Sequence, residues 1–447
     1  MISSSPEPPN PSHAPDLAPA VPAISPQFPA HLMRRGLRLS VWEGALSTIT
    51  ISITGAIGGS VFLTGFALLL GANSFQLGLL GALPFVGQIF GFLAAYLEER
   101  FGNRRMLVLL GSLSGRLIWG LLLALPFIGF LRGAELPIFL LGIALSNGLN
   151  GLAGNAWLSW MSDLVPPRER GRYFGFRNMV VSIVTMATTY LAGSALDSFR
   201  ASGQEPVGYA LIFGVALLAA IGAASVLAYQ PEPPMRRNKA ERLNLLTLFS
   251  IPLREARFRS YALTAAGWAM ATGIASPFFN AYGLNDLKLS FATLSLQAIV
   301  TSAVALVSQH FIGRLQDTLG DRRVLLGSIL GTLLLPWGWV LSTPDNITPL
   351  WLTSIFAGIF WPGIGQGMIN ILMDRAPTVG RGAAIASYGA ITGIGTFVAG
   401  LLGGAVATAL VDVPLALGPI PLTNLTVLFV ATSIGRSLVL IAFWRTL

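Results

Sequence analysis

The sequence predicts an all-α integral membrane protein with twelve transmembrane helices, arranged as two related bundles of six. Three observations carry this prediction. Hydrophobic residues make up 53% of the chain and charged residues only 11%, whereas soluble domains carry about 25% charged residues. Apolar runs near the roughly 20 residues that a helix needs to cross a bilayer follow one another along the chain. Short charged turns separate these runs, and two of the turns occur twice.

The apolar runs define the expected spans and domains in chain order. Residues 1–40 are expected to form a disordered tail, because their beginning is rich in Pro, Ser and Ala and has no apolar period. Residues 41–229 and 261–447 form the two bundles, and residues 230–260, with seven basic residues and four prolines, form a linker on the membrane surface. The expected spans are 43–70, 75–97, 106–130, 136–161, 173–196, 207–229, 261–282, 291–312, 324–341, 349–373, 382–411 and 421–444.

The distribution of positive charge predicts the topology. Of the 28 Lys and Arg residues, 23 fall on the side of the N-terminus, three on the other side, and two, Arg116 and Arg436, inside spans. The positive-inside rule therefore places both termini in the cytoplasm, in a multi-pass protein of the plasma membrane. The net charge of +9 follows this topology, so it does not indicate a nucleic-acid partner.

Two charged turns support an internal duplication. The segment from Glu99 to Arg105, ERFGNRR, matches DTLGDRR from Asp317 to Arg323, and the segment beginning at Asp163, DLVPPRERG, matches DRAPTVGRG beginning at Asp374. The two offsets, 218 and 211 residues, are nearly equal. Internal repeats are a common construction of membrane transporters.

These turns resemble those of the major facilitator superfamily, which carries the pattern GxLxDxxGxRR after its second and eighth helices. In the first half Ala95 replaces the glycine and Glu99 the aspartate. The resemblance implies two six-helix bundles around a central cavity, with the turns acting as a conformational latch. A helix-end carboxylate can accept hydrogen bonds from arginines and from exposed amides at a helix start. The alternatives are that the charges only fix topology or cap helices. The expected latch residues are Glu99, Gly102, Arg104, Arg105, Gly313, Asp317, Gly320, Arg322, Arg323, Asp163, Arg170, Asp374 and Arg381.

Polar residues inside the spans are candidates for a substrate site. Charges in lipid are costly and usually functional, so Arg116 is expected either to bind an anionic substrate or to pair with Glu43. Uncharged polar residues form stripes in the first, fourth and seventh spans and flank Pro362 in the tenth, and the resemblance places the substrate among these four helices. Ser and Thr in such positions often only satisfy helix carbonyls, which is the alternative. The expected substrate residues are Glu43, Thr50, Thr54, Arg116, Asn147, Asn150, Trp268, Thr272, Trp361, Gln366 and Asn370.

Together these features predict a secondary active or facilitative transporter of a small organic solute, working by alternating access. The partners expected are a small-molecule substrate, the lipid bilayer and a coupling ion, H⁺ or another, in a monomer. Asn147 stands where proton antiporters of the superfamily carry an arginine, which weakens drug/proton antiport. No catalytic residue, metal site or cofactor is expected, since no acid pair or His/Glu cluster lies in the spans. The alternative is a membrane sensor or assembly factor with the same fold that transports nothing.

Overall fold

The computed structural model describes residues 28–55, 60–85, 103–128, 133–166, 169–234, 253–376, 381–418 and 420–447, with single residues 87, 90, 93, 97 and 131 between them. The first half contains α1 (Ala30–Thr54), α2 (Val61–Leu69), α3 (Ser74–Ala82), η2 (Leu83–Phe85), α5 (Arg104–Leu122), η3 (Leu125–Phe127), α6 (Glu135–Leu164), α7 (Arg170–Ala201) and α8 (Glu205–Ala228). The second half contains α10 (Ala256–Gly273), α11 (Phe278–Asn285), α12 (Phe291–Leu319), α13 (Asp321–Thr332), α14 (Leu335–Val340), α15 (Thr348–Arg375), α16 (Arg381–Ala409), β1 (Leu415–Leu417), β2 (Ile420–Leu422) and α17 (Asn424–Thr446).

The helices follow the expected spans closely, and the predicted all-α membrane architecture is confirmed. Among the described residues, nine helices are long and apolar enough to cross a membrane. The first and seventh expected spans are each divided, into α1 with α2 and α10 with α11. The second begins with α3 and η2 and continues into a part of the chain that is described only at single residues.

Two helices begin earlier than the sequence predicts. The first, α1, starts at Ala30, so residues 30–40 of the expected tail are helical; residues 1–27 lie outside the described part. The helix α10 starts at Ala256, inside the expected linker, of which residues 235–252 also lie outside the described part.

Breaks inside the apolar runs have local causes. Pro277 stands at the junction of α10 and α11, and Pro336 lies in the first turn of α14, which follows α13. Proline has no N–H to donate and its ring clashes with the preceding turn, so a continuous helix is interrupted there. Between α12 and α13, Gly320 adopts a φ of 83°, a left-handed conformation that favours glycine. This glycine makes the sharp turn between two membrane helices.

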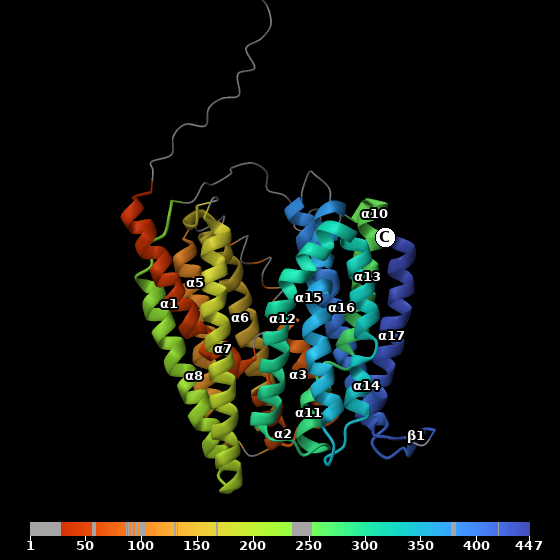
Figure 1. Ribbon diagram of the computed structural model, residues 1–447. Coiled ribbons are helices and arrows are strands. Elements are labelled where there is room, and N and C mark those ends of the chain that lie inside the picture. Colours follow the sequence, from red (N-terminus) through yellow and green to blue (C-terminus); the bar gives the residue numbers. More distant parts are fainter. Residues whose placement is uncertain are drawn as a thin grey trace, which may run out of the picture.

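The two halves stand side by side as separate helical bundles (Figure 1). The start of α1 and the end of α17 lie at the same end of the molecule, which we call the terminal end. At the other end, which we call the opposite end, α3 packs against α16, α7 against α12, and α2 against α11. The halves therefore meet through six helices near one end.

Close backbone approach joins the halves at the opposite end. A Cβ added at Gly404 of α16 would lie 3.0 Å from the Cα and the carbonyl oxygen of Phe75 in α3. A Cβ on Gly78 of α3 would likewise collide with the carbonyl oxygen of Gly400. Small residues permit such approach in a membrane, where packing rather than hydrophobic force associates helices. The glycines thus hold α3 and α16 in direct contact.

Candidate functional site

Two large cavities share Phe85 as a lining residue. The first-half cavity has a volume of about 690 Å³ and is lined by α1, η2, α5, α6, α7 and α8. The second-half cavity has a volume of about 500 Å³ and, apart from Phe85, is lined mainly by residues of α10, α11, α12, α14, α15, α16 and α17. Both volumes fall in the range of small-molecule sites, about 300–1,000 Å³.

A chain of hydrogen bonds between charged and polar side chains lines the first-half cavity. Glu43 is 7% exposed and accepts a hydrogen bond of 2.5 Å from the hydroxyl of Ser47. That hydroxyl in turn accepts a hydrogen bond of 2.9 Å from Arg116. The prediction left open whether Arg116 binds an anion or pairs with Glu43, and the structure links it to Glu43 through Ser47.

Arg177 is a second cation on the same carboxylate, and the sequence reasoning missed it. The charge count places Arg177 with the cytoplasmic loops, whereas the structure places it within α7. Its Nη2 atom lies 3.6 Å from Oε2 of Glu43, and its guanidinium lies 4.6 Å from the ring centre of Trp157. Its position inside the expected span 173–196 is the signal that could have found it.

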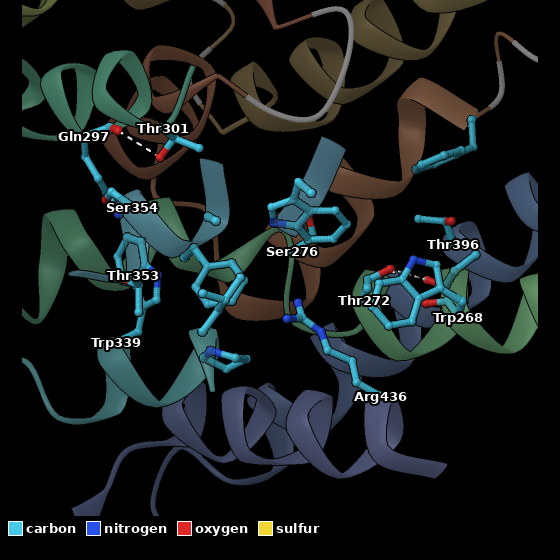
Figure 2. Close-up of a pocket in the computed structure, with 18 residues that line it drawn as sticks. Trp268, Thr272, Ser276, Gln297, Thr301, Trp339, Thr353, Ser354, Thr396 and Arg436 are labelled. Atoms are coloured by element: carbon cyan, nitrogen blue, oxygen red, sulfur yellow. Dashed lines mark hydrogen bonds between the residues drawn. The ribbon is translucent and has the colours of Figure 1, made fainter. Parts of the chain in front are cut away.

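Arg436 is the only cation among the described residues that line the second-half cavity, and no carboxylate lines it there. The side chain reaches from α17 into the space between Trp268 and Trp339 (Figure 2). Its guanidinium lies 5.8 Å from the ring centre of Trp268 and 5.6 Å from that of Trp361. The sequence singled out Arg436 as a deep charge but left it out of the expected substrate residues.

Most of the expected substrate residues reach a cavity. Trp268, Thr272 and Trp361 line the second-half cavity. The first-half cavity is lined by Glu43, Arg116, Asn147 and Asn150.

Four of the expected residues lie elsewhere. Thr50 and Thr54 border a void of only about 20 Å³. Their hydroxyls donate to the carbonyls of Ala216 and Thr50 respectively, which is the alternative role for such residues. The large cavities are not lined by Gln366 or Asn370, and the Asn370 amide donates to Asp321 at 2.8 Å.

Asp197 of the first half joins the two halves at the opposite end. The two carboxylate oxygens of Asp197 in α7 accept hydrogen bonds of 2.8 Å from the backbone N–H groups of Phe291 and Ala292, the first residues of α12. The ring of Phe291 is 1% exposed and packs against Phe62 and Tyr209 of the first half. A carboxylate is most favourable at a helix N-terminus, where unpaired N–H groups and the helix dipole meet it.

At the terminal end, the expected latch residues of the first half form a compact network. Arg104 is buried and pairs with Asp163 at 2.6 Å and with Glu232 at 3.4 Å. The backbone N–H of Arg105 also donates to Glu232. Arg170 donates to the carbonyls at the end of α6, which corresponds to helix capping. Glu99 and Gly102 lie outside the described residues.

The second-half latch residues are arranged differently. Gly313 lies within α12, while Asp317, Arg323 and Asp374 are exposed. The guanidinium of Arg322 donates to the carbonyl of Trp444 in the same half, at 3.0 Å. Arg381 begins α16, and its side chain lies outside the described part. The repeated motif is thus packed in the first half and largely exposed in the second.

No candidate metal site is evident in the part of the chain that the structure describes. No group of three or more His, Cys, Asp or Glu side chains that could hold a metal ion occurs among these residues.

The paired helical bundles, each lining a cavity of small-molecule size, define a polytopic membrane protein. The family model of the Major Facilitator Superfamily matches residues 44–400 and residues 258–446. The chain therefore belongs to the Major Facilitator Superfamily, a family of transporters. A search of curated proteins finds no significant match.

Solved structures of the same fold cover nearly the whole chain. A variant of the nucleoside transporter NupG has a TM-score of 0.73 at 12% identity, covering 91% of this chain and 99% of its own. An auto-inhibited peptide transporter of the POT family gives 0.71 at 12% identity, over 92% and 96% of the two chains. An inward-facing bacterial homologue of the human lysosomal transporter Spinster gives 0.64 at 14% identity, over 94% and 96%. Identities this low show a shared fold and carry no substrate assignment.

Proposed function

We propose that the protein moves a small organic solute across the membrane by alternating access, as a secondary active or facilitative transporter. The observation that carries the proposal is the asymmetry of contact between the halves. Phe291 and Asp197 join the halves at the opposite end, while two cavities of solute size share Phe85 as a lining residue. A closed end beside a cavity of solute size is one of the two states that alternating access requires.

The terminal end is proposed to face the cytoplasm, on the strength of the positive-inside rule. In this state the protein would present its cavities to the cytoplasm. The expected latch, including Asp317 and Arg323, would engage when the terminal end closes. Their exposure in this structure fits a released latch. One chain supplies both cavities and the closure, so the proposed functional unit is the monomer.

Flux measurement tests this proposal directly. The purified protein is reconstituted into liposomes, and uptake of a panel of radiolabelled nucleosides, sugars, dipeptides and organic carboxylates is followed with and without a proton gradient. Saturable uptake of one class above that of empty liposomes is the expected result. A protein that folds and shows no flux of any class under any gradient would contradict transport and support a sensor.

A further inference from the structure

We propose that the second-half cavity binds an organic carboxylate, with the carboxylate group on Arg436 and the apolar body against Trp268 and Trp361. This inference rests on the proposed transport function, because it names the substrate class for a cavity assigned to transport. The proposed ligand is a monoanion, because Arg436 is the single charge among the described residues that line this cavity.

Arg436 carries a buried charge that no described acid in the cavity compensates. Arg436 is 3% exposed; its Nη1 atom donates to the carbonyl of Thr332 at 2.7 Å, while its Nε atom is buried without a hydrogen-bond partner. Burying a charge is unfavourable unless it is paired and hydrogen-bonded. Within a membrane such residues mark substrate pathways. A bound anion would supply both the missing charge and the missing acceptor.

The first-half cavity provides an internal comparison. There Arg116 is linked through Ser47 to Glu43, and Arg177 lies beside the same carboxylate. The protein therefore supplies its own acid beside those two arginines. It supplies none among the described residues around Arg436, which favours the second-half cavity as the anion site.

The shape and lining of the cavity specify the rest of the solute. A guanidinium presents two parallel N–H groups that match a carboxylate. The rings of Trp268 and Trp361 lie 6.0 Å apart at 60° to each other, and Phe85, Phe279 and Trp339 add further aromatic surface. Aromatic walls favour an apolar or ring-bearing body. A strongly hydrated inorganic anion would gain little from them.

The first measurement uses the wild-type protein. Benzoate, phenylacetate and indole-3-acetate are titrated by isothermal calorimetry into the detergent-purified protein, each beside its neutral amide. At least one carboxylate is expected to bind with a Kd below about 1 mM, and its amide at least about tenfold more weakly, because only the anion pairs with the guanidinium. The proposal is overturned if none of the three binds at about 10 mM, or if the amides bind equally well.

Variants then locate the site. Arg436→Gln is expected to weaken carboxylate binding about 10- to 100-fold, and Arg436→Lys by less, because lysine keeps the charge without the planar fork. The matched control is Arg375→Gln, which removes another arginine of the second half that donates to a backbone carbonyl, that of Thr446, away from the lining of either cavity. Its affinity should stay within about twofold of wild type, a difference below 0.5 kcal/mol. Equal loss in both variants, or loss only in Arg116→Gln, would overturn the assignment.

A measurement on a variant that keeps Arg436 covers the case in which the Arg436 variants do not fold. The chain has no cysteine, so Thr272→Cys places a single thiol in this cavity. The binding carboxylate should protect that thiol from a maleimide and the amide should not; equal protection would contradict the proposal.

Flux separates this inference from the transport proposal. Binding of the carboxylate by a protein that shows no flux of any solute class in liposomes would refute transport and leave the anion site standing. Flux of a neutral solute that neither the carboxylate nor Arg436→Gln affects would refute the anion site and leave transport standing.

Discussion

The contact between Asp197 and α12 gives the sharpest prediction about the transport cycle. Asp197→Asn removes the charge and leaves one acceptor oxygen for the two N–H groups, of Phe291 and Ala292, that the carboxylate now holds at 2.8 Å. A hydrogen bond to a charged group contributes about 1.5–3 kcal/mol, and the charge at a helix N-terminus adds about 0.3–1 kcal/mol. When the opposite end opens, hydrogen bonds to water replace part of this stabilisation. The net loss expected for Asp197→Asn is about 1.5–2 kcal/mol.

In the proposed alternating-access cycle that loss falls on the state closed at the opposite end, because Asp197 and α12 would separate when that end opens. A difference of about 1.5–2 kcal/mol changes the ratio of the two states roughly 10- to 30-fold. Molecules open at the opposite end should therefore become that much more frequent in the variant.

Accessibility labelling measures this shift. Ser276→Cys supplies a single thiol that lines the second-half cavity, and a membrane-impermeant maleimide is applied to vesicles from the side of the opposite end. Asp197→Asn should raise the labelling rate about 10- to 30-fold. The control is Asp412→Asn, which makes the same substitution at an exposed residue after α16. A change below about twofold in Asp197→Asn, or the same change in the control, would refute the role assigned to Asp197.

Two further predictions concern the packing of the halves and of the first-half cavity. Glu43→Gln should destabilise the fold by about 1–3 kcal/mol, since it leaves two neighbouring arginines without a counter-charge. Adding Arg177→Gln should recover part of the lost melting temperature in detergent. A further drop in the melting temperature of the double variant would contradict the pairing of Glu43 with Arg177. Gly404→Leu should lower flux and favour the state open at the opposite end, because the side chain would collide with the backbone of Phe75. The control is Gly214→Leu, at a position where a Cβ meets nothing within 4 Å. Unchanged maleimide labelling of the Gly404 variant would contradict the close approach of α3 and α16.

The membrane architecture was predictable from the sequence for a simple physical reason. A bilayer fixes the length of an apolar helix, and its core accepts few charges. Spans and turns can therefore be recognised from short contiguous stretches of the sequence. The repeated turn GRLQDTLGDRR therefore marked the second half, and α12 and α13 meet at its Gly320. The helix breaks were missed although Pro277 and Pro336 signal them, because the apolar runs continue across both prolines.

The candidate site was predictable only in part. Helical spacing brought Trp268 and Thr272 onto one face of α10, and both line a cavity. Asn370 was proposed from its place near Pro362 in the tenth span, and its amide donates to Asp321 of α13. Spacing shows which residues share a face of one helix, but not which neighbour that face meets.

The sequence alone determined that this chain crosses a membrane repeatedly as two related halves, because hydropathy and turn motifs are properties of contiguous residues. Only the tertiary structure decided which buried charges are compensated. Arg116 reaches Glu43 through Ser47, 69 residues away in the chain, and Asp197 meets an α12 that begins 94 residues later, whereas Arg436 faces a cavity without an acid among its described lining residues. Such pairings depend on how helices pack against one another, and no local pattern in the chain encodes that packing.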